Sequence, residues 1–181
     1  MSQPQRHDAG LASGGGAEPH GAAQDRGGHH GHRGDTHRHF AVSVFVGWQG
    51  RLLLHRHAKL RRWLPCGGHI EPNELPDDAA VREVLEEAGV QVRLTGEKTL
   101  SVAGDGLPVQ LVRPRGVQLE VISPGHEHID LIYFAVPQEP YDGGLAGSEE
   151  GLGWYSPTET GALGLDAEMR AWTELAFAEL G

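Results

Sequence analysis

Short apolar runs divide the chain from Phe40 onward into predicted strands separated by turn-forming residues. Several of these runs are rich in β-branched and aromatic residues, which is typical of strands in a sheet. The runs cover residues 40–46, 51–55, 90–94, 116–122, 129–136 and 152–155. The sequence Gly47-Trp48-Gln49-Gly50 separates the first two runs, so we expect a turn there and a hairpin around it.

Two further segments repeat their apolar residues with helical spacing. The first covers residues 77–88, with Pro76 before it and Gly89 after it, as is common at helix ends. Its apolar face consists of Val81, Val84, Leu85 and Ala88. The second begins after Asp166, a good N-cap residue. Its apolar stripe consists of Met169, Trp172, Ala176 and Leu180. This order of strands and helices predicts an α/β fold in which a mixed β-sheet is sandwiched between α-helices.

The first 39 residues have a different composition from the rest of the chain. They contain nine Gly, seven of the twelve His and a single Leu, and they lack aromatic residues. Such a segment cannot bury enough apolar surface to offset the entropy of ordering it. We therefore predict a disordered Gly/His-rich tail over residues 1–39 and one folded domain over residues 40–181. The histidines of the tail could bind transition metals only loosely.

The formal net charge of −10 belongs to residues 40–181, because four Arg balance four acidic residues in the tail. An acidic domain argues against a nucleic-acid polymer as partner, since phosphate backbones are bound by Lys and Arg. A small phosphate substrate is compatible with this charge if a divalent cation lies between the two.

No apolar run approaches the roughly 18 residues of a membrane helix. With the single Cys66 there is no disulfide framework, so we expect a cytoplasmic protein without a membrane partner.

Three glutamates at helical spacing suggest a cation site. Glu83, Glu86 and Glu87 stand at i, i+3 and i+4, which places their carboxylates on one helix face. Like charges at this spacing repel, and acidic runs on helices are usually solvated faces. Three carboxylates kept together suit a hard cation such as Mg²⁺, with Mn²⁺ as a substitute. Arg82 is a candidate to pair with Glu74 and fix the preceding loop to the helix.

The segment from Gly68 to Val90 resembles the Nudix hydrolase signature. That signature is a Gly, five residues, Glu, seven residues, Arg-Glu, an aliphatic residue, any residue, Glu-Glu, any residue, Gly and an aliphatic residue. The chain matches it at every specified position. The preceding strand pair and the late Trp154-Tyr155 strand also resemble the wider Nudix domain, and the GHEHIDLIYF stretch is similar to a MutT-like subgroup. One local difference is Cys66, which stands where many members have Pro; we interpret it as a small buried loop residue.

The resemblance implies specific roles for the signature residues. Glu83, Glu86, Glu87 and the carbonyl of Gly67 resemble the metal ligands, with Mg²⁺ as the cofactor. Arg82 and Glu74 resemble the pair that orients the catalytic helix, and Glu83 is a candidate proton acceptor. The implied reaction is the attack of metal-activated water on a diphosphate linkage.

Several substrates are compatible with this resemblance. A nucleoside di- or triphosphate is the substrate expected for a MutT-like enzyme, and a nucleotide sugar or a dinucleotide is the alternative. A non-catalytic module that senses a nucleotide is the third possibility. The loss of a signature glutamate would have favoured it, and none is lost here. We expect a small nucleotide as the partner of the domain in each case.

Weaker signals mark candidate substrate-binding residues outside the signature: Arg56, Glu127, His128 and Glu150. Arg56 opens a basic stretch up to Arg62, which equally suits a solvated loop. In isolation, the His126-Glu127-His128 sequence could indicate a metal ligand pair or polar residues at a strand end. The resemblance to the MutT-like subgroup implies a further option, in which these residues face the substrate. Glu149 and Glu150 precede a strand where many Nudix enzymes place a further metal ligand or base.

Overall fold

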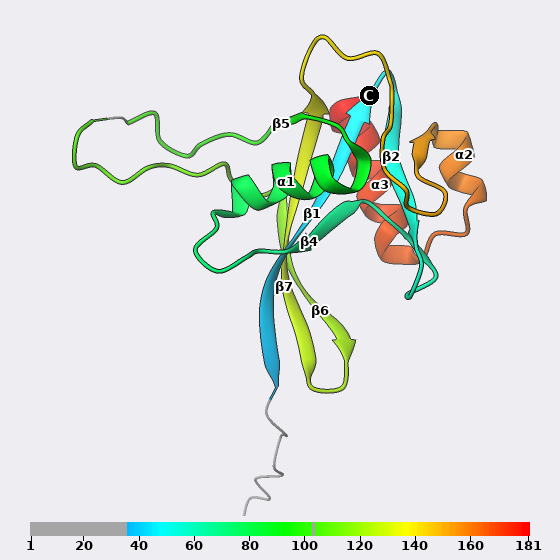
Figure 1. Ribbon diagram of the computed structural model, residues 1–181, viewed down its shortest axis with the longest axis horizontal. Helices are drawn as coiled ribbons and strands as arrows, with labels where there is room; N and C mark the ends of the chain where they lie inside the picture. Colours follow the sequence, from blue (N-terminus) through cyan, green and yellow to red (C-terminus); the bar gives the residue numbers. More distant parts are fainter. Residues whose placement is uncertain (1–35, 103) are drawn as a thin grey trace, which may run out of the picture. The chain divides into compact units, whose positions relative to one another are not determined.

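A computed structural model of the protein describes residues 36–102 and 104–181. Most of the predicted tail lies outside the described residues. The described chain forms eight strands and three helices in the following order (Figure 1): β1 (His37–Trp48), β2 (Arg51–His57), β3 (Arg62–Leu64), β4 (Cys66–His69), α1 (Pro76–Ala88), β5 (Val92–Leu94), β6 (Gly116–Ser123), β7 (His126–Pro137), β8 (Gly153–Tyr155), α2 (Pro157–Ala162) and α3 (Ala167–Leu180).

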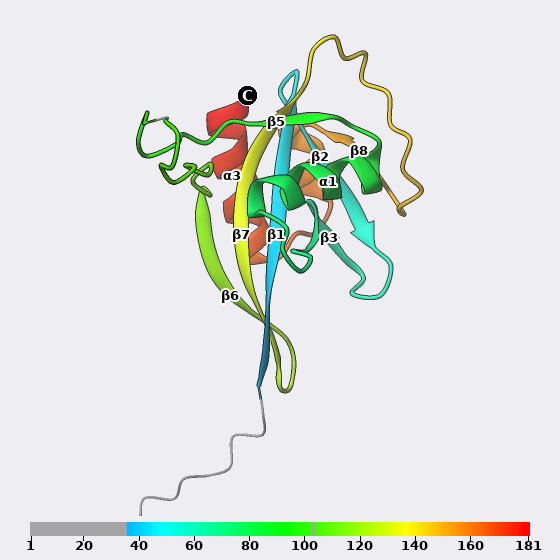
Figure 2. The ribbon, with the colours of Figure 1, turned by 60° about the vertical axis from the view of Figure 1, so that its left-hand side comes forward.

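The strands form one mixed sheet. Its main order is β3-β2-β1-β7-β5, with β4 paired to β1, β6 paired to β7 and β8 paired to β2. The two longest strands, β1 and β7, run parallel, and the other pairs are antiparallel. Helices α1 and α3 cover opposite faces of this sheet (Figures 1 and 2). The prediction of a mixed sheet between helices is therefore confirmed.

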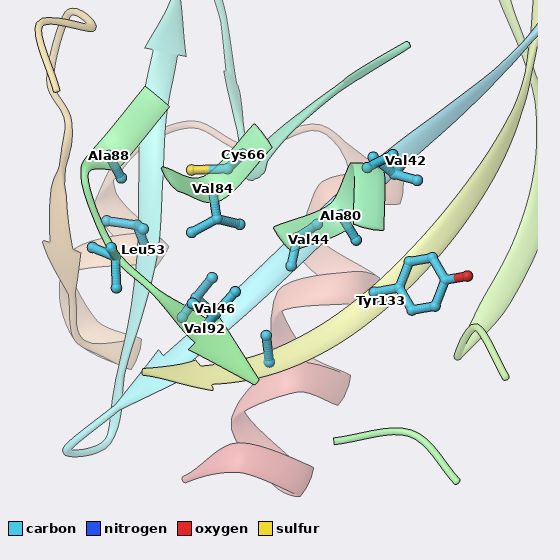
Figure 3. Packing of buried hydrophobic residues seen from close by; sticks show 13 residues of the cluster. Val42, Val44, Val46, Leu53, Cys66, Ala80, Val84, Ala88, Val92 and Tyr133 are labelled. Atoms are coloured by element: carbon cyan, nitrogen blue, oxygen red, sulfur yellow. The ribbon is translucent and has the colours of Figure 1, made fainter. Parts of the chain in front are cut away.

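Alternation along β1 explains why both faces of the sheet are covered. Val42, Val44 and Val46 belong to the core cluster that includes Ala80 and Val84 of α1 (Figure 3). The intervening Phe45 belongs to the second cluster, with residues of β7 and α3. Burying a Val or Phe side chain contributes on the order of 1.5–3 kcal/mol. Apolar residues on both faces of a central strand therefore favour a three-layer domain.

Helix α1 has the ends that its sequence predicts. Pro76 lies in its first turn with two aspartates behind it, where negative charge interacts favourably with the helix dipole. Gly89 ends the helix with a φ of 72°, and its N–H donates to the carbonyl of Leu85. A left-handed cap of this kind favours Gly over any other residue. These ends fix which turn of the helix carries the three glutamates.

The structure differs from the sequence prediction at several element boundaries. Strand β1 begins at His37 rather than Phe40, and β7 begins at His126 rather than Ile129. The cause is their mutual pairing, which starts with His37 opposite His126 and satisfies the backbone of polar residues that show no strand pattern. The short strands β3 and β4 lie in a segment predicted as a loop.

Helix α2 was also not predicted. Its N-terminus carries a capping box, in which the Ser156 hydroxyl accepts from the N–H of Glu159 while the Glu159 carboxylate accepts from the N–H of Ser156. The described residues between β5 and β6 form neither helix nor strand. None of the helices in residues 36–102 and 104–181 is long and apolar enough to span a membrane.

Candidate active site

Arg82 of α1 fixes the loop between β4 and α1. Its guanidinium donates from Nε to Glu74 Oε1 over 2.7 Å and from Nη2 to Glu74 Oε2 over 3.0 Å. Nη2 also donates to the carbonyl of His69 over 3.1 Å. The hydrogen bonds from Arg82 lower the pKa of Glu74. The two-pronged contact therefore holds the loop in one orientation relative to the helix, as the sequence predicted for this pair.

The same arginine lies among the helix carboxylates. Its Nη1 donates to Glu83 Oε1 over 2.8 Å and to Glu86 Oε2 over 3.1 Å. The hydrogen bond with Glu74 raises the pKa of Arg82 most, and the contact with Glu83 raises it further. Arg82 thus offsets part of the repulsion between carboxylates that stand one turn apart.

Strand β4 lies so close to β1 on one side and to α1 on the other that two of its positions require glycine. A Cβ atom on Gly67 would overlap the backbone carbonyl of Val42 in β1. A Cβ atom on Gly68 would lie 2.5 Å from Glu83 Oε1. Because neither glycine has a side chain, the backbone of β4 can pass directly beside the carboxylates. As a result, the Gly67 N–H lies close enough to donate to Glu87 Oε2 over 3.0 Å.

Glu87 is the most electrostatically perturbed of the three helix carboxylates. Its pKa is raised to about 7, mainly by burial and also by the negative charges of Glu83 and Glu149, while the hydrogen bond from Gly67 opposes the rise. The Nε2 atom of His55 lies 3.8 Å from Glu87 Oε2, and its Nδ1 atom lies 3.8 Å from Glu149 Oε2. Only 2% of His55 is exposed. Burial lowers the pKa of His55, which favours its neutral form. The acidic charge around Glu87 therefore has little local compensation.

This arrangement fits a hard divalent cation. The side chains that face one another are carboxylates, and the Gly67 carbonyl belongs to the strand beside them. Oxygen donors of this kind match the preference of Mg²⁺ and Mn²⁺. A cation there would also compensate the negative charge that raises the pKa of Glu87. Glu83, Glu86, Glu87 and Gly67 are thus compatible with the metal-ligand role that the signature implies.

A cleft of about 410 Å³ lies beside these glycines. Its lining includes Gly67, Gly68 and His55, together with Ser43 and Asp130 of the sheet. The Ser43 hydroxyl donates to Asp130 Oδ2 over 2.8 Å. Asp130 Oδ1 is buried and has no hydrogen-bond partner among the described residues. The lining residues thus include a carboxylate with one unpaired oxygen.

The NUDIX domain family matches residues 36–176. The chain belongs to the Nudix family. A crystal structure of a NUDIX-family hydrolase from Clostridium perfringens is 33% identical, with a TM-score of 0.67 over 80% of this chain and 99% of that chain. The Ap4A hydrolase of C. elegans is 18% identical, with a TM-score of 0.55 over 80% of this chain and all of that chain, and shares the fold.

The curated relatives match only a short part of the chain. The diphosphoinositol polyphosphate phosphohydrolase 3-alpha of Mus musculus is 64% identical over 33 residues. These residues make up 18% of this chain and 20% of the mouse protein. The matched segment spans about a fifth of the length of that relative. Membership of the Nudix family supports a hydrolase that acts on pyrophosphate bonds.

The weaker substrate-binding candidates fall in different places on the Nudix domain. His128 lines the cleft, and burial together with neighbouring imidazoles lowers its pKa to about 4. Arg56 pairs with Glu150 over 2.7 Å. Glu127 pairs with Arg38 over 2.7 Å on the opposite side of β7 from His128. The structure does not bring these two ion pairs together with His128, and their role in substrate binding stays a prediction.

Sequence reasoning missed the contributions of His55, Ser43 and Asp130 to the cleft. Asp130 had a detectable signal, because it follows His126 and His128 at the spacing of two that places strand residues on one face. His55 and Ser43 lie in apolar strands where nothing local marks them. Cys66 is fully buried, and burial raises the pKa of its thiol well above the ordinary value, as suits a packing residue.

Proposed function

We propose that this Nudix protein is a Mg²⁺-dependent pyrophosphohydrolase that cleaves a diphosphate linkage in a nucleotide. The observation that carries the proposal is the contact between β4 and α1. There, Gly67 and Gly68 allow the backbone of β4 to lie beside Glu83 and Glu87. Both glycines also line the cleft. Mn²⁺ is the substitute cofactor, because it accepts the same oxygen donors.

In this proposal Glu83, Glu86, Glu87 and the Gly67 carbonyl hold the metal. When bound, Mg²⁺ neutralises charge on phosphate oxygens and lowers the pKa of a bound water molecule. Glu83 accepts the proton of the attacking water, and its side chain is held by Arg82 at 2.8 Å. Arg82 and Glu74 are positioning residues, since their hydrogen bonds fix the helix relative to the β4 loop.

The cleft is the proposed site for the rest of the substrate. Its volume of about 410 Å³ lies within the range of about 300–1,000 Å³ that is usual for small-ligand pockets. Asp130 and Ser43 of its lining offer polar contacts. We favour a nucleoside di- or triphosphate as substrate, with His128 in contact with it. Arg56, Glu127 and Glu150 are proposed as outer contacts.

A dinucleotide or a nucleotide sugar is the second candidate class. The Ap4A hydrolase of C. elegans and a UDP-X diphosphatase share the fold with this chain. The short match to diphosphoinositol polyphosphate phosphohydrolases adds a non-nucleotide diphosphate to the panel of substrates. A sensing module without catalysis is disfavoured, because Glu83, Glu86 and Glu87 are all present and share one helix face.

The test is a substrate panel with Mg²⁺ or Mn²⁺, run on wild type and on Glu87→Gln. The panel contains nucleoside triphosphates, dinucleotides, nucleotide sugars and a diphosphoinositol phosphate. We expect Glu87→Gln to lose at least about a hundredfold in rate on the best substrate, as when charge stabilisation is removed from an active site. The matched control is Asp78→Asn, the same acid-to-amide change at an exposed position of α1.

Three outcomes would contradict the proposal. The first is unchanged turnover in Glu87→Gln, and the second is the absence of hydrolysis of every panel member by the wild-type protein. Loss of rate in Asp78→Asn equal to that in Glu87→Gln would also count against it, because the effect would then follow from general acidity rather than from the carboxylates beside β4.

A further inference from the structure

A cluster of three histidines lies on the wall of the cleft. His69 ends β4, while His126 and His128 begin β7. Residues two apart in a strand share a face, which brings His126 and His128 together. Strand β1 pairs with both β4 and β7, and Ala41 lies between His69 on one side and Asp130 on the other. The sheet therefore brings together imidazoles that are 59 residues apart in sequence.

The ring nitrogens of these histidines converge on one point. His128 Nε2 lies 3.1 Å from His69 Nε2 and 3.1 Å from His126 Nε2. One ring nitrogen from each of the three residues lies within 4.8 Å of the others. The ring of His39 in β1 is also near, with centroid distances of 5.2 Å to His126 and 5.4 Å to His69. Four imidazoles thus surround a small volume.

Hydrogen bonds among the three imidazoles cannot satisfy all of their facing Nε2 atoms. The Nε2 atom of a neutral imidazole carries either one proton or one lone pair. His128 Nε2 faces two other Nε2 atoms at the same distance, so a single proton or lone pair is shared between two partners. A cation at the centre would instead accept one lone pair from each of the three rings.

The distances match a transition metal with nitrogen ligands. Zn–N bonds are about 2.0–2.1 Å long, so two imidazole nitrogens on a tetrahedral ion lie about 3.4 Å apart. Two of the three separations are 3.1 Å, close to this value, and all three lie within 4.8 Å. Imidazole suits Zn²⁺, Cu²⁺ and Ni²⁺, whereas Mg²⁺ prefers oxygen. The cluster is also reachable from solvent, because His69 is exposed and the other two are partly exposed.

We propose that His69, His126 and His128 form a transition-metal site of the Zn²⁺ class, separate from the oxygen-ligand site on α1. His39 or a water molecule supplies the fourth ligand. The evidence for this site does not rest on the proposed hydrolysis, because its ligands are nitrogen atoms from β4 and β7 rather than carboxylates of the helix. The metal would lie on the wall of the cleft whose lining also includes Gly67 and Gly68, the glycines beside the carboxylates, and it would bind His128, the residue proposed above to contact the substrate.

The test is a Co²⁺ titration of the full-length protein, followed by optical absorption in excess Mg²⁺. Excess Mg²⁺ occupies oxygen sites, and tetrahedral Co²⁺ with imidazole ligands absorbs far more strongly than octahedral Co²⁺ with oxygen ligands. We expect one equivalent of Co²⁺ to give the tetrahedral bands, and one equivalent of Zn²⁺ to remove them. Calorimetry with Zn²⁺ measures the affinity of the same site.

Matched variants decide which histidines bind the metal. His128→Gln should weaken Zn²⁺ binding more than about a hundredfold, because losing a ligand exceeds the effect of losing an outer-shell partner. His69→Gln is the second variant and should do the same. His57→Gln is the control, since His57 lines the same cleft but lies outside the cluster. A second control replaces His29, His30 and His32 of the N-terminal segment with Gln.

The site is supported if both cluster variants lose the Co²⁺ bands while the two controls keep them, with unchanged thermal unfolding of each metal-free variant. It is overturned if the wild type gives no tetrahedral bands. It is equally overturned if His128→Gln and His69→Gln bind Zn²⁺ as the wild type does, or if the N-terminal variant alone abolishes binding. Failure of this test would leave the Mg²⁺-dependent substrate assay unaffected, so the two proposals can be judged separately.

Discussion

The two clusters of this molecule differ in the atoms they present, although they share one short strand. Strand β4 gives the backbone of Gly67 to the carboxylate cluster of Glu83, Glu86 and Glu87, and it gives His69 to the histidine cluster. Carboxylates repel one another, so α1 carries Arg82 to hold Glu83 and Glu86. Two imidazole nitrogens of the histidine cluster approach to 3.1 Å.

If both proposals hold, this difference would let one domain keep two kinds of cation apart. Hard oxygen donors and borderline nitrogen donors rank metals differently, so donor type can select the ion at each position. The donors also come from different structural sources. The carboxylates follow one another along a helix, whereas the imidazoles meet only because β4 and β7 both flank β1. Substitutions in β4 can therefore either disturb both clusters or separate them.

The largest effect is expected for Gly67→Ala, which should disturb both clusters at once. The new Cβ would overlap the Val42 carbonyl, and a backbone atom of a central strand cannot move away cheaply. We expect about 3 kcal/mol or more of lost stability, together with loss of both metal readouts. Urea unfolding measures the stability, the panel assay reports on the carboxylates, and Co²⁺ absorption reports on the histidines.

Gly161→Ala is the control for this prediction. A Cβ on Gly161 in α2 would contact no other atom within 4 Å, and Ala is favoured over Gly in a helix. That variant should be as stable as the wild type or more so. A Gly67→Ala protein with wild-type unfolding and both metal readouts intact would show that β4 does not couple the clusters.

An intermediate effect is expected for Gly68→Ala, which should separate the clusters. Its Cβ would meet the carboxylate of Glu83, the end of a flexible side chain, so the fold can adapt by moving that group. Displacing a reacting group by about 1 Å can cost about a hundredfold in rate. We expect Mg²⁺-dependent turnover to fall by about that factor, while Zn²⁺ affinity at the histidines stays within about twofold of wild type because no imidazole moves. Equal losses in the two readouts would contradict this separation.

The carboxylate cluster was predictable from sequence because its geometry is local. Helical spacing alone placed Glu83, Glu86 and Glu87 on one face, and the signature resemblance implied the pairing of Arg82 with Glu74. The structure contains both features. The caps of α1 and the Asp166 cap of α3 were predictable for the same reason, since they depend on neighbouring residues.

The histidine cluster could not be completed from sequence because its geometry depends on strand pairing. The spacing of His126 and His128 was visible, but nothing local connects them to His69. That contact depends on the parallel pairing of β1 with β7 and the antiparallel pairing of β1 with β4. The polar starts of β1 and β7 were missed for the same reason, because pairing rather than an apolar pattern makes them strands.

The smallest effect is expected for Asp166, which lies outside both clusters and tests whether they respond to general stability. Its carboxylate accepts from the N–H of Met169 over 3.0 Å and from Arg62 over 2.6 Å. Although burial alone would raise it, the pKa of Asp166 is lowered by these hydrogen bonds and by the charge of Arg62. Because the folded pKa lies below the unfolded value of 3.8, the ionised carboxylate stabilises the protein at pH values above 3.8. This contribution is lost as the pH falls through the folded pKa.

Asp166→Ala should therefore cost about 1 kcal/mol of stability at neutral pH, mostly through loss of the helix cap, because the Arg62 pair is partly exposed. The difference from wild type should narrow in urea unfolding below about pH 4, where the wild-type carboxylate becomes protonated. Asp166→Asn keeps a cap acceptor, so it should lose only the part that depends on pH. Both metal readouts should match those of the wild type at neutral pH. A loss of either readout in Asp166→Ala, at this small cost in stability, would mean that the clusters report on the stability of α3 rather than on their contacts with β4.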